Sequence, residues 1–172
     1  MNKENGLHTC CFFGHRKVRN VAVVKSRIYH EAENLIVNKS VGIFLLGSKS
    51  EFDDMCHEVV TSLKKKYPHI KRIYVRAEYP NIDDSYKNYI LERYEDTYYP
   101  EHIKNAGKAV YVERNQEMIN KSDYCVVYYD ENYAQPRRSK QNLPSYQPKS
   151  GTKAAYDFAV KNNKKIINLY TE

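Results

Sequence analysis

The sequence predicts a doubly wound α/β domain, in which helices flank a mainly parallel central sheet of about five strands. Short apolar runs alternate along the chain with longer stretches in which apolar residues recur every three or four positions. This pattern is typical of parallel strands joined by crossover helices. The length of 172 residues is that of one domain with one hydrophobic core. We therefore expect residues 1–172 to fold as a single domain.

Three units of a strand followed by a helix are predicted in the first part of the chain. The strands are three apolar runs, at residues 9–13, 41–46 and 70–75. The first helix is indicated by apolar residues at helical spacing, namely Val21, Val24, Ile28, Ala32 and Leu35. The second, which Pro68 closes, has an apolar face made of Phe52, Met55, Cys56, Val59, Val60 and Leu63. Regularly spaced aromatic residues predict the third helix over residues 82–95.

The second part of the chain continues the alternation after an irregular segment at residues 98–107. A short helix is expected over residues 114–120, and residues 124–129 form an apolar run that suits a central strand of a parallel sheet. Residues 130–150 lack an apolar period and contain Pro136 and Pro144, so we expect a long loop, either a functional lid or a disordered insertion. Gly151 and Thr152 open a last helix, and residues 165–170 form the closing strand.

Charge and cysteine usage narrow the classes of function. The chain carries 28 Lys and Arg residues against 21 Asp and Glu residues, a net charge of +7. This charge favours an anionic partner, although lysines at helix ends account for part of it. No apolar run approaches the roughly 18 residues of a membrane span, and residues 1–8 lack the apolar core of a signal peptide. The four cysteines form no C-x-x-C motif, which indicates reduced thiols in a cytoplasmic protein without a metal site.

Candidate binding residues gather at the carboxyl ends of the predicted strands, where open parallel sheets bind their ligands. Glycine lets a backbone approach a ligand closely, and Ser or Thr at a helix N-terminus adds a hydroxyl to amides that favour anions. Taken singly, each residue is explained as well by a strand end or a helix cap. Together they predict a phosphate site, although neither G-x-G-x-x-G nor a P-loop is present. The candidates are Gly14, His15, Arg16, Gly47, Ser48, Asp53, Asp130, Ser150, Gly151 and Thr152.

Several motifs, in order along the chain, resemble the SLOG superfamily. The segment TCCFFGHR at residues 9–16 is similar to the TCCFTGHR opening of short bacterial and phage members. Further matches to the family order R-N-x-x-M, S-D, Y-D, G-G-T and I-N-L lie at residues 114–118, 122–123, 129–130, 150–152 and 167–169. Gly47 and Asp53 fit the middle of the pattern. The resemblance covers nearly the whole chain and is closest to the YpsA-like branch.

This resemblance implies a Rossmann-like fold that binds nucleotides or nucleotide-derived ligands. The relatives include the Lonely-guy phosphoribohydrolases and DNA-processing protein A. The chain departs from the hydrolase motif P-G-G-x-G-T-x-x-E, because Ser150 replaces a glycine and Ala155 stands in place of the catalytic glutamate. Asp157 is poorly placed on the helix to substitute for that glutamate, which leaves Asp53 or Asp130 as the carboxylate for such a reaction.

The leading hypothesis is a module that binds or senses a nucleotide or a nucleotide-derived small molecule, with no further cofactor. Ribose would be bound by Asp53 or Asp130, and His15 would act as an acid, a base or a hydrogen-bond donor. Phosphate would be held by Arg16, Arg114 with its neighbour Asn115, Thr152, and the backbone amides near Gly47 and Gly151.

Two other functions are left open by the sequence. One is a nucleotide-processing hydrolase that uses His15 or Asp53 at the same site. The other is a nucleic-acid-binding protein, suggested by the net charge and by the basic sequence RRSK at residues 137–140. The density of aromatic residues between Tyr86 and Tyr99 also makes that region the candidate interface of a homodimer.

Overall fold

The computed structural model is a three-layer α/β/α domain, and it describes residues 6–47, 50–103, 107, 109–133 and 151–172. Six strands, all paired in parallel, form one sheet in the order β4-β3-β2-β1-β5-β6. The doubly wound architecture predicted from the sequence is therefore confirmed. The strands are β1 (His8–Gly14), β2 (Val41–Leu46), β3 (Lys71–Val75), β4 (Asp96–Tyr98), β5 (Tyr124–Tyr128) and β6 (Lys165–Asn168).

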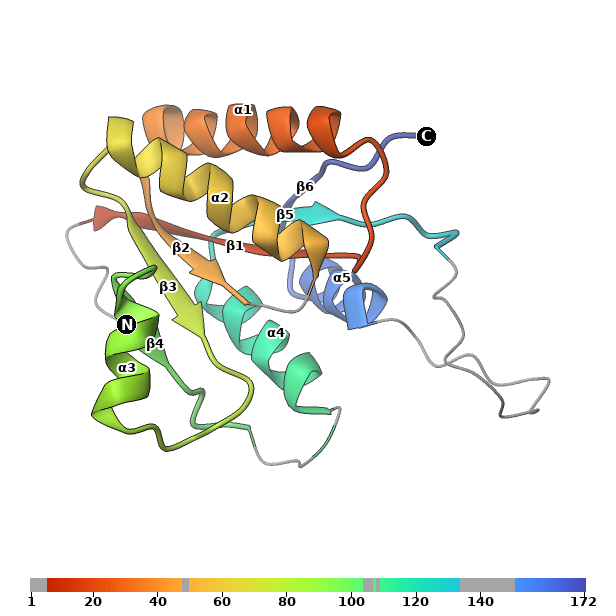
Figure 1. Ribbon diagram of the computed structural model, residues 1–172. Coiled ribbons are helices and arrows are strands. Elements are labelled where there is room, and N and C mark those ends of the chain that lie inside the picture. The colour runs from red at the N-terminus through yellow and green to blue at the C-terminus, as the bar shows by residue number, and fades with distance from the viewer. Residues whose placement is uncertain (1–5, 48–49, 104–106, 108, 134–150) are drawn as a thin grey trace.

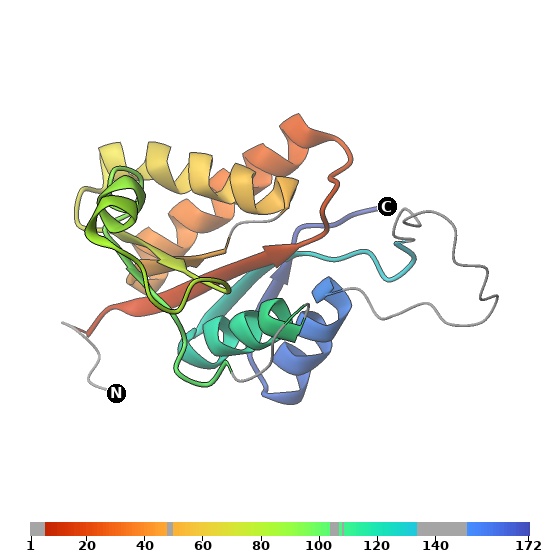
Figure 2. The ribbon, with the colours of Figure 1, turned by 60° about the horizontal axis from the view of Figure 1, so that its bottom comes forward.

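Four of the helices in the described residues cover the two faces of the sheet, with α1 and α2 on one face and α4 and α5 on the other (Figures 1 and 2). The shorter helix α3 contacts the edge strand β4. The helices are α1 (Val21–Lys39), α2 (Glu51–Lys66), α3 (Asp84–Leu91), α4 (Ala109–Lys121) and α5 (Gly151–Lys161).

The structure corrects the sequence-based prediction between residues 82 and 121. The expected number of about five strands was too low, because the three-residue strand β4 lies in a region predicted to be helical and then irregular. The third helix is shorter than predicted and ends at Leu91. Helix α4 is longer than predicted and begins at Ala109. An edge strand of three residues with one buried side chain, Thr97, is too short to produce a detectable apolar run.

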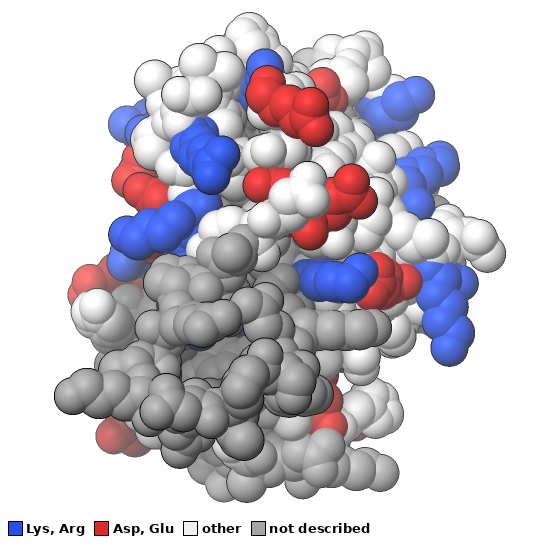
Figure 3. All heavy atoms as spheres, turned by 90° about the vertical axis from the view of Figure 1, so that its right-hand side faces the viewer, with Lys and Arg blue, Asp and Glu red and all other residues white. Residues whose placement is uncertain are grey.

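Strand β1 lies where the direction of the strand order reverses, because its neighbours are β2 on one side and β5 on the other. Since all strands are parallel, their carboxyl ends lie at one edge of the sheet. This edge faces the right-hand side of Figure 1 and the viewer in Figure 3. The reversal point of a parallel sheet is where loops diverge and leave space for a ligand.

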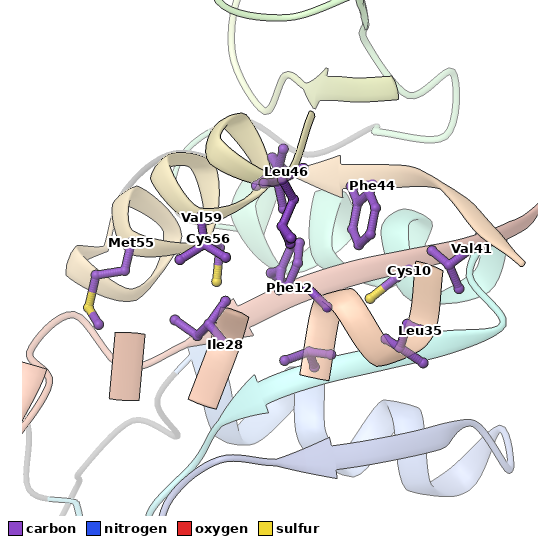
Figure 4. Close-up of a cluster of buried hydrophobic side chains, with 14 of the residues drawn as sticks. Cys10, Phe12, Ile28, Leu35, Val41, Phe44, Leu46, Met55, Cys56 and Val59 are labelled. Carbon is purple, nitrogen blue, oxygen red and sulfur yellow. The ribbon is translucent and has the colours of Figure 1, made fainter. Parts of the chain in front are cut away.

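Alternating side chains of the central strands divide the core between the two faces. Cys10 and Phe12 of β1 face α1 and α2, whereas Cys11 and Phe13 face α4 and α5. All five residues of β5 are buried, as expected for a strand covered on both faces. Figure 4 shows the first cluster, in which strand residues meet Ile28, Leu35, Met55, Cys56 and Val59 of the two covering helices.

The four cysteines are buried and free of disulfides. Burial raises the pKa of Cys10 and of Cys56 well above the usual value, so both remain neutral thiols that pack like small apolar side chains. Within the described ranges, no helix is long and apolar enough to cross a membrane. The greater part of the predicted loop at residues 130–150, with its RRSK sequence, lies outside the described residues.

Replacing Phe44 by alanine is expected to lower the free energy of unfolding by about 3 to 5 kcal/mol, because it leaves a cavity in a rigid core. The Phe44 ring is fully buried and stacks on Phe12 with 5.8 Å between centroids. Val37→Ala, on the exposed face of α1, is the control and is expected to change stability by about 0.5 kcal/mol or less. Urea denaturation measures both, and equal effects of the two substitutions would contradict this placement of the core.

Candidate functional site

The predicted site residues lie along the carboxyl edge of the sheet, at the ends of three neighbouring strands. Gly14 is the last residue of β1, Gly47 directly follows β2, and Asp130 lies two residues beyond β5. Adjacent strands are about 4.8 Å apart, so these three positions form a short row. Asp53 joins the row from the first turn of α2. Ser48 and Ser150 lie outside the described residues.

A buried arginine occupies the edge at the ends of β2 and β3. Arg114, on α4, is 4% exposed. Its Nη1 donates to the carbonyl oxygen of Val75 at 3.3 Å, and its Nε donates to Oδ1 of Asn115 at 3.0 Å. A Cβ atom at Gly47 would lie 2.6 Å from the guanidinium carbon, so glycine is needed there for the arginine to lie against the backbone.

Asp53 is the acidic group of this part of the site. It is 9% exposed, and its backbone N–H donates to Oγ of Ser50, the N-cap of α2, at 2.9 Å. Burial raises the pKa of Asp53 to about 7, although the charge of Arg114 and the hydrogen bond to Ser50 act in the opposite direction. Asp53 is therefore close to half-protonated at neutral pH and is able to give or take a proton there.

Arg114 is consequently a buried cation with no carboxylate of the described residues within 4.0 Å, although Asp53 and Glu78 act on it from further away. Burial lowers the pKa of Arg114, and Asp53 is the first of the groups that oppose this change. The ion pairs formed within 4.0 Å by the described residues do not join these two side chains. The hydrogen-bond acceptors of Arg114, a backbone carbonyl and an amide side chain, are both neutral. A buried guanidinium in such surroundings favours the arrival of an anion.

His15 lies at the ends of β1 and β5 and is 1% exposed. Its Nε2 lies 2.8 Å from the backbone nitrogen of Asp130 and 3.1 Å from the carbonyl oxygen of the same residue. Nε2 accepts from the N–H in one tautomer of the ring and donates to the carbonyl oxygen in the other. Burial lowers the pKa of His15, which keeps the ring neutral at pH 7. The buried Nδ1 atom has no hydrogen-bond partner among the described residues.

Tyrosine rings that were not identified from the sequence as site residues lie against this histidine, and Tyr156 is joined to them through Tyr129. His15 stacks on Tyr133 with 4.0 Å between ring centroids and an interplanar angle of 14°. Tyr129 lies 5.7 Å from His15 and stacks in turn on Tyr156 of α5, at 4.4 Å. We call His15, Tyr129, Tyr133 and Tyr156 the aromatic cluster. In the sequence these tyrosines could not be distinguished from the core residues that account for most tyrosines.

Arg76 is a second buried arginine that the sequence analysis missed. It directly follows β3 and is mostly buried. One of its terminal nitrogens, Nη1, donates to the carbonyl oxygen of Tyr79, whereas its buried Nε has no partner in the described part of the chain. Open parallel sheets bind ligands at the carboxyl ends of their strands, which is why Gly14 and Gly47 were predicted. Arg76 could have been predicted in the same way, because it lies just beyond the carboxyl end of a predicted strand.

The remaining predicted residues have more peripheral positions. Arg16 is exposed, and its carbonyl oxygen accepts from the N–H of Glu51 at 3.1 Å. Gly151 is exposed at the start of α5, whereas Thr152 is buried. Ala155 is buried in the core beneath the sheet, and Asp157 pairs with Lys153 at 3.3 Å. Ala155 has no carboxylate and that of Asp157 is paired, so neither residue gives α5 a free carboxylate for catalysis.

Arg114→Gln is expected to raise the pKa of Asp53 further above its ordinary value, because the substitution removes a charge that favours the carboxylate. The control Lys25→Gln removes an equal charge from the exposed Lys25–Glu58 pair and leaves this pKa unchanged. Carbon-13 NMR titration of the aspartate carboxyls measures both. A raised pKa also means that Asp53 stabilises the fold best when protonated, and that this contribution is lost as the pH rises from about 4 to about 7.

Comparison with solved structures identified a protein of similar fold. A solved structure of DNA processing protein A from Helicobacter pylori, described for its single-stranded DNA binding mode, has a TM-score of 0.58 and 15% sequence identity. The similarity covers 92% of this chain and 63% of that chain. It shows a shared fold, since the identity is too low to carry function. A search of curated proteins gave no match.

The family comparison covers almost the whole sequence. The model of the YspA SLOG family matches residues 8–170, a range that includes every strand and helix of the structure. The resemblance inferred from the motifs at both ends of the chain is confirmed by this match. The chain belongs to the YspA SLOG family.

Proposed function

We propose that this protein binds a nucleotide or a nucleotide-derived small molecule at the carboxyl edge of its sheet. One observation carries the proposal: the buried guanidinium of Arg114 lies against Gly47, and its hydrogen-bond acceptors among the described residues are neutral. A phosphate group would supply the missing negative charge. The guanidinium of arginine carries a planar array of hydrogen-bond donors, which makes it well suited to bind phosphate.

Two acidic residues of the same edge, Asp53 and Asp130, offer contacts for the ribose of such a ligand. Asp130 is buried beside His15, and one of its oxygens accepts from the N–H of Asn132 at 2.9 Å. Asp53 lies on the other side of the row, in the electrostatic field of Arg114. Carboxylates at such places bind ribose hydroxyls in other nucleotide-binding folds. Phosphate at Arg114 and ribose at Asp53 or Asp130 would together give a partner to these three charged side chains.

Arg114→Gln is expected to weaken nucleotide binding by about ten- to a hundredfold, because it removes charge-assisted hydrogen bonds to phosphate. Isothermal titration calorimetry with the four nucleoside 5′-monophosphates and NAD measures the effect. Lys25→Gln is the matched control, because it changes the net charge equally at a distant surface. Equal affinities of the two variants would contradict phosphate binding at Arg114.

Gly47→Ala offers an independent test of the same contact. The added methyl group would collide with the guanidinium rather than with backbone atoms, so the arginine is expected to move while the fold persists. The expected result is a loss of nucleotide affinity similar to that of Arg114→Gln, with little change in the urea midpoint. A large loss of stability with unchanged affinity would argue against this account of Gly47.

A second candidate function is hydrolysis of a nucleotide, which the pKa of Asp53 favours. A carboxyl group with a pKa of about 7 is suited to general acid or base catalysis at neutral pH. Chromatography of nucleoside monophosphates incubated with the protein tests this function. Release of base or phosphate that Asp53→Asn abolishes would support it, whereas intact nucleotides would leave binding as the function.

Nucleic acid is a further partner to be tested. The net charge of +7 favours it, but basic and acidic side chains of the described residues alternate on the face shown in Figure 3. Binding of a single-stranded oligonucleotide that falls steeply with salt would support this role. The homodimer also stays a prediction, for which the exposed rings of Tyr86 and Tyr89 on α3 offer a surface.

A further inference from the structure

The aromatic cluster lies directly beside the proposed phosphate contacts. His15 follows β1 and Tyr129 follows β5, whereas Gly47 follows β2, on the other side of β1. Phe52 connects the two regions, because its ring lies against Gly14 and 5.9 Å from the ring of Tyr128, and the next residue is Asp53. A ligand that extends along this edge from Arg114 would therefore reach the aromatic cluster.

The chemistry of this cluster suits a flat, polar ring system. Tyr129, Tyr133 and Tyr156 are half-buried, so parts of their rings remain accessible while neighbouring rings fix their orientation. The buried Nδ1 of His15 has no hydrogen-bond partner among the described residues, and a buried polar atom without a partner is costly whether it is a donor or an acceptor. Nucleic-acid bases combine aromatic faces with hydrogen-bond acceptors in the ring plane, and they stack well on tyrosine.

A second group of tyrosines, on and before α3, is less suitable for this role. Tyr79, Tyr86 and Tyr89 are exposed and in mutual ring contact. The N-terminal end of α3 carries Asp83 and Asp84, whose charges repel phosphate. The aromatic cluster at β5 contains the neutral histidine instead, and so offers both a stacking surface and a polar ring nitrogen.

We propose that the aromatic cluster holds the base of the ligand, with Nδ1 of His15 forming a hydrogen bond to a polar group in the plane of that base. This inference rests on the proposed binding of phosphate at Arg114. It specifies the ligand class as a nucleoside phosphate with an intact base, and it excludes a sugar phosphate as the preferred ligand. It also gives the ligand a direction, with phosphate at the ends of β2 and β3 and the base at the end of β5.

Calorimetry with two kinds of probe tests the assignment, namely the four nucleoside 5′-monophosphates and ribose 5-phosphate. We expect at least one nucleotide to bind the unmodified protein about tenfold more tightly than ribose 5-phosphate. Tyr133→Leu is expected to lower that nucleotide affinity about tenfold, with the affinity for ribose 5-phosphate unchanged. Tyr133→Phe keeps the ring and retains binding, and Tyr89→Leu on α3 is the control.

Three results would overturn the inference. These are equal affinities of the unmodified protein for nucleotides and ribose 5-phosphate, unchanged nucleotide binding by Tyr133→Leu, and equal losses for both probes. If Arg114→Gln weakens both probes while Tyr133→Leu weakens neither, phosphate binding stands and the base site fails. If neither probe binds the unmodified protein, the proposed function itself fails, and the base site with it.

A measurement on the unmodified protein avoids any effect of substitution on folding. Nitrogen-15 NMR of the histidine side chains reports the environment of Nδ1 in His15 directly. We expect its resonance to shift on addition of the bound nucleotide and to remain in place on addition of ribose 5-phosphate. A resonance that responds equally to both probes would refute the hydrogen bond to the base.

Discussion

Strand β1 is the element on which the rest of the structure depends, because it pairs in parallel with both β2 and β5. Its central position separates the crossover helices onto the two faces of the sheet and leaves the carboxyl edge open at the point of reversal. The same strand supplies side chains to both core clusters, through Phe12 on one face and Phe13 on the other. The burial that stabilises the sheet therefore also fixes the positions of Gly14 and His15 at its end.

The carboxyl edge concentrates polar groups that contribute little to stability by themselves. Arg114 and Asp53 are both buried, and burial acts against the charged form of each. Their mutual attraction offsets only part of that cost, because removing two charges from water is expensive even when they are neighbours. The phosphate that we propose as a ligand would offset more of that cost. At the other end of the row, the buried Nδ1 of His15 is a neutral polar atom without a partner among the described residues.

Particular residues show where prediction from the sequence succeeded. The run at 41–46 coincides with β2, because β-branched and aromatic residues between clear breaks leave little ambiguity. Gly47 and Asp53 were predicted by combining strand ends with motif order; the structure places both at the carboxyl edge of the sheet, and their part in binding stays a prediction. Prediction failed for β4, which is too short to have a period. It also failed for Tyr133, whose ring contact with His15 joins residues 118 positions apart in the sequence.

The sequence by itself determined the class of fold and the order of nearly all strands and helices. These features follow from local periodicity and from the chirality of parallel crossovers, both of which can be read along a single chain. The tertiary structure alone decided that Arg114 lies against Gly47, that burial raises the pKa of Asp53 to about 7 and that Nε2 of His15 lies against both backbone groups of Asp130. Each of these depends on burial and on contacts between distant segments, because a charge or a hydrogen-bond donor acquires its chemical behaviour from the surroundings that folding creates.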